Sequence, residues 1–285
     1  MENDITLTSG FIINPNKSKI IIDGTYNNVK STYTNNLESL EKNVIKASTK
    51  NKEIILKNMN IISSSGYGVI YVPSHPNYSN VVVEYNNVNF TGIELSQNYY
   101  GTTKIIDSVI EVKDTNNVLA QRACDSNKVL IGGNTSINSS AVDKPVIFLN
   151  DVIPSTLKIM PNSKVTITTK EELMNGTNRL DLIVGHGAEF LLTTGNGFSI
   201  TTTHGARNVL IEEEAKFTFI ENNHQRVPMW SVFGDFIVKE NASLEIINTF
   251  MTTPTDNYNI YFKGTNQNFI LDNPKYVNIY TKNAN

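Results

Sequence analysis

Short apolar runs recur along this chain at a nearly constant spacing. Each unit has a short apolar run, a polar turn, and then a second run in which apolar and polar residues alternate. The second runs predict half-buried strands, because alternation with a period of two places apolar side chains on one face. The units are about 24 to 28 residues apart, which is typical of the coils of a solenoid. The apolar runs begin near Ile54, Val81, Ile105, Val129, Leu157, Leu182, Val209 and Phe236.

A unit of two short strands cannot bury its own apolar face, so successive units must stack on one another. Parallel stacking also satisfies the backbone groups between neighbouring units. The pattern therefore predicts an all-β fold, a single-stranded parallel β-helix (β-solenoid) of about ten coils. The alternation predicts inward side chains at Ile54, Leu56, Met59, Ile61, Val88, Phe90, Ile110, Val112, Val165, Ile167, Phe217 and Phe219.

The turns between the paired runs carry residues that tolerate positive φ or bond nearby backbone. In stacked coils these residues would form a column along the axis. We interpret the column as a structural ladder, and a row of ligand-binding amides remains the alternative. Its members are Asn58, Asn86, Asn87, Asp107, Gly132, Gly133, Asn162, Gly185, Gly187, Asn241 and Asn273.

The pattern favours one β-helix domain over residues 1–285, taken from a larger surface protein. Coils in residues 1–125 have long intervening loops and many tyrosines, whereas coils in residues 126–285 have a more uniform turn and a plainer surface. Within residues 35–47 the apolar positions have helix-like spacing, so we expect a short helix or a loop over the core there.

Composition narrows the possible functions. The net charge of -3 at pH 7 and the pI of about 5.9 give no basic stripe, which argues against nucleic-acid binding. The sequence has no apolar run of membrane-spanning length, so membrane insertion is not expected. Cys124 is the only cysteine, so no intrachain disulfide can form. We expect an extracellular protein at the cell surface or cell wall, and a monomer within a longer chain.

Tyrosine is concentrated in one region. Half of the 12 tyrosines fall between Tyr67 and Tyr100, beside loops that contain glycine and proline. Aromatic rings with nearby amides suit sugar recognition, because rings stack on the apolar faces of sugars while amides bond the hydroxyls. The alternative is that some of these rings plug the coil or pack loops. The six are Tyr67, Tyr71, Tyr78, Tyr85, Tyr99 and Tyr100.

A β-helix fold also suggests an enzyme that cleaves polysaccharides. A lyase needs a base, together with a cation or an arginine cluster that stabilises the developing enolate. Glu94 and Arg122 are candidates for such roles, and Asp107, Glu111, Asp114 and Asp125 form the densest carboxylate set in the first half. A calcium ion is possible among these carboxylates. The four histidines show no metal-ligand spacing, so no metal residues are assigned.

Several ordered segments carry a family resemblance. GYGVIYVP from Gly66, GIELSQNYYGTTKIIDS from Gly92 and IGGNTSI from Ile131, with the later KIMPNSKVTITT and LDLIVGHGAEFLLTT, resemble the pectate lyase-like adhesive domain of Gram-positive bacterial surface proteins. The resemblance covers most of the chain. It implies a right-handed β-solenoid, surface display, and adhesion to polysaccharide or host glycans without catalysis. One departure is Ile93 and Glu94 before Leu95, where the family usually has Pro-Gln.

Three functions follow from these observations. The first is a non-catalytic adhesin module that binds polysaccharide or host glycan. The second is a calcium-assisted, pectate-type polysaccharide lyase, and the third is a passive structural spacer in a wall-anchored protein. The first predicts no catalytic residues and no cofactor, and a ligand-binding set made of Tyr67, Tyr71, Tyr78, Tyr85, Glu94, Gln97, Asn98, Tyr99, Tyr100 and Arg122.

Overall fold

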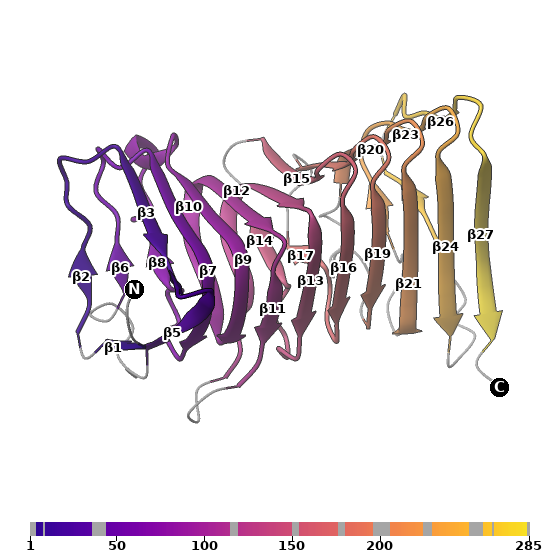
Figure 1. Ribbon diagram of the computed structural model, residues 1–285. Coiled ribbons are helices and arrows are strands. Elements are labelled where there is room, and N and C mark those ends of the chain that lie inside the picture. The colour runs from indigo at the N-terminus through magenta and orange to yellow at the C-terminus, as the bar shows by residue number, and fades with distance from the viewer. Residues whose placement is uncertain are drawn as a thin grey trace.

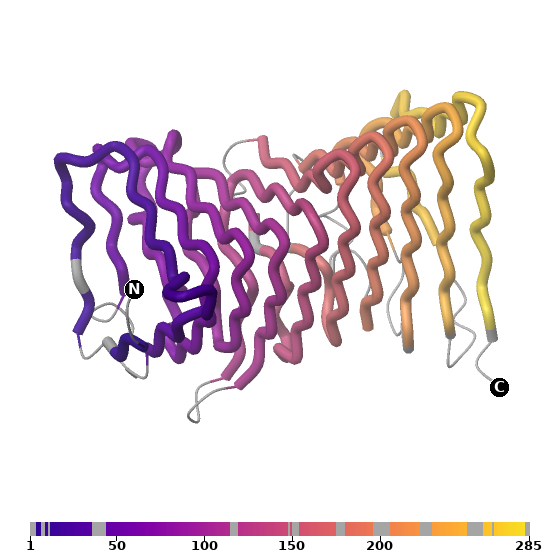
Figure 2. The backbone as a smooth tube through the Cα atoms, viewed as in Figure 1, coloured from indigo at the N-terminus to yellow at the C-terminus, as the bar shows by residue number. Residues whose placement is uncertain are grey.

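The chain winds into a parallel β-solenoid, as the repeat predicts. The computed structural model describes residues 4–7, 9–35, 44–114, 119–149, 154–175, 180–195, 206–224, 230–250, 259–263 and 265–283. Strands on the near side of Figure 1 point down while the coils advance from the N-terminus at left to the C-terminus at right, so the solenoid is right-handed. The backbone trace in Figure 2 follows the same path from coil to coil. The described residues contain no helix that could span a membrane.

Three parallel ladders form three sides of the solenoid. The first side contains β3 (Lys19–Asp23), β7 (Glu53–Ser63), β9 (Val82–Gly92), β10 (Glu94–Ile106), β12 (Arg122–Gly132), β15 (Ser155–Ile159), β18 (Leu180–Val184), β20 (Ala206–Ile211), β23 (Phe236–Val238) and β26 (Phe269–Leu271). Strands β7 and β9 continue around a corner into the second side. The other second-side strands are β1 (Ile5–Leu7), β5 (Val29–Asn35), β11 (Val109–Val112), β13 (Asn134–Ser139), β16 (Lys164–Thr169), β19 (Glu189–Thr194), β21 (Lys216–His224), β24 (Ser243–Phe250) and β27 (Tyr276–Asn283).

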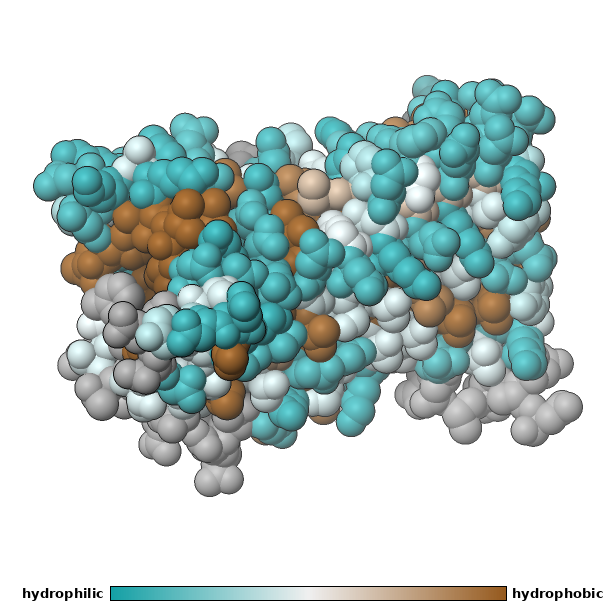
Figure 3. All heavy atoms as spheres, in the orientation of Figure 1, coloured by the Kyte–Doolittle hydropathy of each residue, from teal (hydrophilic) through white to brown (hydrophobic). Residues whose placement is uncertain are grey.

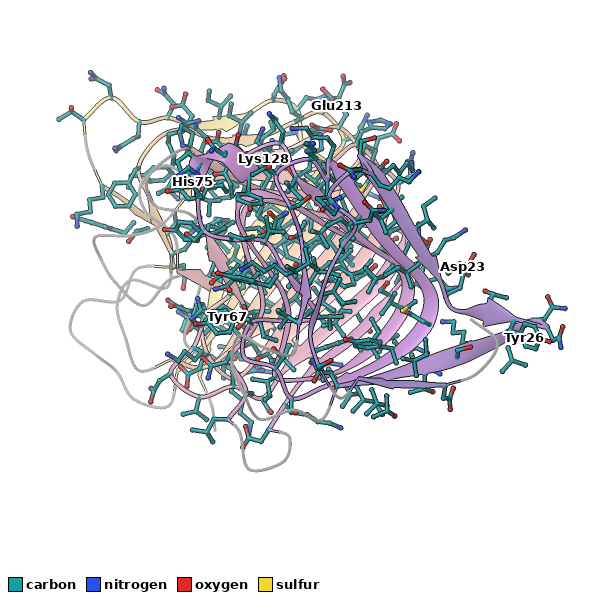
Figure 4. All side chains as sticks on the ribbon, turned by 90° about the vertical axis from the view of Figure 1, so that its left-hand side faces the viewer. Asp23, Tyr26, Tyr67, His75, Lys128 and Glu213 are labelled. Atoms are coloured by element: carbon teal, nitrogen blue, oxygen red, sulfur yellow. The ribbon has the colours of Figure 1, made fainter. Side chains whose placement is uncertain are left out.

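The third side is built from shorter strands. It contains β2 (Phe11–Ile12), β6 (Ile45–Lys46), β8 (Ile70–Tyr71), the first halves of β10 and β12, β14 (Ile147–Leu149), β17 (Met174–Asn175), β22 (Ser231–Val232) and β25 (Tyr261–Phe262). A hairpin of β4 (Thr25–Tyr26) against β5 projects from the first coil, with Tyr26 at its tip in Figure 4. Residues 36–43, within the expected helix or loop, lie outside the described residues, and Ile45–Lys46 is a strand.

The solenoid makes about eight full turns rather than the ten predicted. The first-side ladder does pass through every coil that the sequence pattern indicates. A pair of strands in the sequence marks two sides of a coil and shows nothing about the third side, so counting pairs does not count full turns.

The predicted core is confirmed. All twelve predicted inward side chains are buried, with exposed fractions of 1% or less. In the C-terminal coils the interior becomes aromatic. The rings of Phe217 and Phe219 lie 5.9 and 5.8 Å from that of Trp230, and Phe236 lies 5.2 Å from Trp230 on another side.

The turn column is also confirmed as a structural ladder between the first and second sides. Asn58, Asn87, Asp107, Gly133, Asn162, Gly187, Asn241 and Asn273 all have positive φ. Amides bond along the axis, since Asn87 Nδ2 donates to Asn58 Oδ1 at 2.8 Å. Asparagine and glycine suit this position because they adopt left-handed backbone at low cost.

The outer surface drawn in Figure 3 is largely hydrophilic, with hydrophobic residues gathered over the N-terminal coils at left. Exposed apolar side chains in these coils include Ile12, Ile21 and Val29. The third side faces away in that view and is seen at the left of Figure 4, where Tyr67 and His75 mark its two ends.

Candidate functional site

Four coils place outward side chains in one row on the third side. Lys46 in β6 pairs in register with Tyr71 in β8, and Gln97 in β10 pairs with Asp125 in β12. The two halves are joined because the Val72 backbone N–H donates to the Gln97 carbonyl at 2.8 Å. Neighbouring strands are about 4.8 Å apart, so the row Lys46, Tyr71, Gln97 and Asp125 is continuous along the axis. We call it the third-side row.

A pair of tyrosines lies at the centre of this surface. The rings of Tyr67 and Tyr71 are 5.2 Å apart at an interplanar angle of 68°, which is an edge-to-face contact. The ammonium group of Lys46 lies 5.7 Å from the centre of the Tyr71 ring. Both rings are partly buried and partly open to solvent.

The loop that carries Tyr67 is held close to the strand below it. Gly68 has φ of +77°, and a Cβ atom there would lie 2.8 Å from the backbone of Ser96. Only glycine fits both the left-handed conformation and the close approach. Gly68 thus fixes the position of Tyr67 over the third side.

The other tyrosines form a separate group at the corner between the third and first sides. Tyr99 and Tyr100 make an edge-to-face pair with ring centres 5.3 Å apart. They stand at an irregularity of β10, next to Asn98. Tyr78 ends a short 3-10 helix, η1 (Pro76–Tyr78), and packs partly against the core. The cluster therefore contains two edge-to-face pairs, Tyr67 with Tyr71 and Tyr99 with Tyr100.

Two predicted binding residues lie inside the solenoid. Tyr85 is fully buried, and this burial raises the pKa of its hydroxyl. The hydroxyl donates to the Leu95 carbonyl at 2.9 Å. Asn98 is also fully buried, and its Nδ2 donates to the carbonyls of Val81 and Thr102. Both side chains hold the coil together, and we leave them out of the candidate surface.

Glu94 in β10 pairs in register with Arg122 in β12. Asp125 lies three residues after Arg122 in the same strand. Arg122 Nη1 is 3.1 Å from Asp125 Oδ1. Glu94 is only 3% exposed, and its pKa is raised well above the usual range by burial and by the Asp125 carboxylate, against the opposing charge of Arg122. Burial also raises the pKa of Asp125, which Arg122 and Gln97 partly offset.

Buried acceptors gather on the same stretch of β10. Oε1 of Glu94 and Oε1 of Gln97 have no hydrogen-bond partner among the described residues. A buried acceptor without a partner costs about 1 to 3 kcal/mol. Because both atoms are buried, this cost falls on the stability of the coil.

The chemistry that this site can perform is recognition more readily than proton abstraction. Glu94 is only 3% exposed and its pKa is raised by burial, so its carboxyl is poorly placed to reach a proton on a bound substrate. The described residues hold no group of three or more His, Cys, Asp or Glu side chains suited to a metal ion. His75 only caps η1, where its Nδ1 accepts from the Asn77 backbone N–H.

The sequence analysis missed two members of the third-side row, Lys46 and Asp125. Asp125 was considered only as part of a carboxylate set. Aligning the third-side strands by their apolar residues would have placed Asp125 beside Gln97, since Ser96 and Cys124 precede them in matching positions.

Another hollow lies away from every predicted site residue. It has a volume of about 280 Å³ and lies on the second side, over β16, β19 and β21. Its floor contains Leu191, and Lys164, Glu189 and Lys216 line it from successive coils.

Comparisons with known proteins address the fold. A scan against family models finds no matching family, and a search of curated proteins finds no matching protein. A solved chain described as "L. reuters 100-23 SRRP", a serine-rich repeat protein, superimposes with a TM-score of 0.60 at 15% identity, over 98% of this chain and 91% of that chain. The two chains share a fold. A second solved chain, "L. reuteri 53608 SRRP", gives a TM-score of 0.49 at 14% identity, over 99% of this chain and 92% of that chain.

Proposed function

We propose that this chain is a non-catalytic adhesin module that binds polysaccharide or host glycan at the bacterial surface through the third-side row and Tyr67. The observation that carries the proposal is the Tyr67 and Tyr71 pair, partly open to solvent and continuous with Lys46 on one side and Gln97 on the other.

The chemistry of this surface matches a glycan. Ring faces pack against the apolar faces of sugars, while the Gln97 amide and the Lys46 ammonium group bond hydroxyls or carboxylates. The row extends along the axis, so it offers successive contacts to a chain of sugar units.

The fold and the family resemblance support the setting of this activity. The chain shares a solenoid fold with a serine-rich repeat protein, and its segments resemble the adhesive domain of Gram-positive surface proteins. We therefore place it outside the cell, at the surface or wall, as part of a longer chain and without a cofactor.

The test is binding to an array of pectic, mucin and matrix polysaccharides, followed by affinity measurements on the best ligand. We expect Tyr71→Ala to weaken binding about tenfold, because one aromatic contact contributes roughly 1 to 1.5 kcal/mol. Tyr26→Ala is the matched control, since Tyr26 is 45% exposed on the hairpin and remote from the third side.

Two results would count against the proposal. One is a folded protein that binds none of the polysaccharides. The other is equal binding and equal cell adhesion by the wild type and by a Tyr67→Ala and Tyr71→Ala double variant, which would favour the passive spacer.

A second candidate, the calcium-assisted lyase, is favoured by one observation, the neighbouring positions of Glu94 and Arg122. It predicts unsaturated uronate products that absorb ultraviolet light and disappear with a chelator or with Arg122→Ala. Product formation above a heat-inactivated control would replace the adhesin proposal.

A further inference from the structure

Strand β10 carries an insertion at the corner between the third and first sides. It pairs in register with β12 up to Asn98 and again from Thr102. Between these two positions β12 contains a single residue, whereas β10 contains Tyr99, Tyr100 and Gly101. The two extra residues form a bulge. Bulges disrupt the ladder locally and redirect side chains, and they are over-represented beside functional sites.

Two residues hold this bulge in shape. Asn98 is fully buried, and its Nδ2 donates to the carbonyl of Val81 at 3.1 Å and to the carbonyl of Thr102 at 3.0 Å. One amide thus joins both ends of the bulge to the chain that precedes it. A Cβ atom at Gly101 would overlap the Asn98 amide and the Val81 carbonyl oxygen, so only glycine leaves room for this arrangement.

Core packing does not explain the two rings on the bulge. Tyr99 and Tyr100 are both partly exposed, and their rings meet edge-to-face at an interplanar angle of 81°. Tyr78 packs against the core from its partly buried position, whereas neither Tyr99 nor Tyr100 is among the described side chains that do so. Partly exposed rings beside a disrupted ladder suit contact with a ligand better than a role in stability.

The bulge begins next to the third-side row. Gln97 belongs to the row and Asn98 faces the interior, so the alternation of the strand returns Tyr99 to the outer face. Two residues along a strand span about 6.6 Å, which makes Gln97 and Tyr99 neighbours across the width of the third side. This direction follows the strands, from Tyr67 towards His75 in Figure 4. The two tyrosine pairs therefore stand at different positions across one side of the solenoid.

We propose that Tyr99 and Tyr100 form a second sugar-binding subsite, which contacts a further unit of the glycan held at Tyr67 and Tyr71. This inference rests on the adhesin function proposed above. The glycan follows the third-side row as far as Gln97 and turns there towards the corner. Its ligands are therefore saccharides of several units, since a short fragment fills one subsite only. Affinity rises with chain length until both subsites are filled, because the second contact is then made within one complex.

The bulge gives Asn98 and Gly101 a role in binding without contact to the glycan. They are positioning residues, because Asn98 ties the ends of the bulge and Gly101 leaves room for its amide. Loss of this support would move the corner subsite and leave the third-side row in place.

Binding as a function of chain length tests the second subsite. The probes are intact pectin, mucin and hyaluronan, together with size-fractionated fragments of each. A Tyr99→Ala and Tyr100→Ala double variant should bind the intact probe roughly tenfold or more weakly, because it loses aromatic contacts. The shortest fragment that still binds should lose far less, since Lys46, Tyr71 and Gln97 hold it. Tyr71→Ala should weaken the binding of both.

Gly101→Ala tests the positioning role. Its added Cβ displaces the Asn98 amide, so it should weaken binding of the intact probe as the double variant does and spare the shortest fragment. A general loss of folding would weaken both equally. Gly185→Ala is the matched control, because its Cβ would lie 2.7 Å from the Ile159 carbonyl oxygen, in a coil remote from the corner. This control should leave probe binding unchanged.

The outcomes separate this inference from the function on which it rests. If the Tyr99→Ala and Tyr100→Ala variant bound the intact probe as the wild type does, or lost affinity equally for intact probe and shortest fragment, the second subsite would be overturned. The adhesin proposal would stand in either case, provided that Tyr71→Ala weakened binding. A folded wild type that bound none of the three probes would overturn both.

Discussion

The interior of the solenoid differs between its middle and its C-terminal part. In the first halves of β10 and β12 it buries polar side chains, among them Glu94, Asn98 and Ser126. Between β19 and β24 the interior buries aromatic rings. The rings of Phe190 and Phe217 are stacked with centres 5.0 Å apart, and Trp230 packs edge-to-face against Phe217.

The two parts of the interior therefore contribute differently to the stability of the fold. Burial of apolar surface contributes about 25 cal/mol per Å², so the aromatic coils stabilise themselves. Buried carboxyls and unpartnered acceptors oppose folding, so the third side near Glu94 depends on the coils that flank it. Such costs are typical of positions where function rather than stability determines the residue.

The largest expected effect comes from the aromatic part. Trp230→Ala should lower the free energy of unfolding by about 3 to 5 kcal/mol, because it leaves a cavity among three phenylalanine rings. Urea unfolding followed by circular dichroism measures the loss. Each coil contacts mainly its neighbours, so the proposed glycan binding at Tyr71 should persist in this variant at low urea.

Trp230→Phe is the control, since it keeps most of the volume and should cost much less than the alanine variant. If Trp230→Ala lost less than about 1 kcal/mol, or if it abolished binding at Tyr71 in folded protein, the two parts would not be separable in this way.

The fold was predictable because its determinants are local and periodic. The alternation around Ile54 and Leu56 and the turn residue Asn58 each recur in the following coils, and stacking is the arrangement that buries such units. The number of full turns was not predictable from the same pattern. The third side is formed by short strands such as Met174–Asn175, which have no periodicity of their own.

The candidate site was predictable only in part. Tyr67, Tyr71, Gln97 and Arg122 do lie on or beside one surface, whereas Tyr85 and Asn98 lie inside the solenoid. The alternation Val81, Val83 and Tyr85 already indicated that Tyr85 faces the interior. Lys46 could not be assigned, because its contact with Tyr71 depends on the pairing of β6 with β8, two strands of only two residues each.

An intermediate effect is expected in the turn column, which runs along the axis beside both the polar and the aromatic parts of the interior. Asn87→Ala should lower the free energy of unfolding by about 2 kcal/mol, since it loses the bond to Asn58 and puts alanine, which tolerates left-handed backbone less well than asparagine, at φ of 54°. Asn87→Gly keeps the backbone unstrained and should lose only about 1 kcal/mol. Thermal unfolding of both variants separates the two causes.

Equal losses for Asn87→Ala and Asn87→Gly would show that the left-handed backbone adds no cost there. The column would then stabilise the coils through its amides alone, and the sequence rule that places asparagine and glycine at these turns would need another basis.

The smallest effect concerns the polar interior and depends on pH. The pKa of Glu94 is raised in the folded chain, mainly by burial, so folding favours the protonated carboxyl. Below the usual value of 4.5 the group is protonated in both states, and its contribution to stability is fully present. As pH rises, the unfolded chain ionises first, and stability falls until the folded pKa is passed.

Glu94→Gln should therefore match the wild type at pH 4 and be more stable than the wild type at pH 7.5, because the glutamine has no proton to lose as the pH rises. Urea unfolding at several pH values measures the difference. Glu189→Gln, at an exposed position on the second side, is the matched control for the loss of one negative charge and should change stability by less than about 0.5 kcal/mol. A Glu94→Gln variant less stable than the wild type at pH 7.5 would mean that the ionised carboxylate is stabilised by Arg122. The middle of the solenoid would then hold a favourable ion pair instead of an unfavourable buried carboxyl.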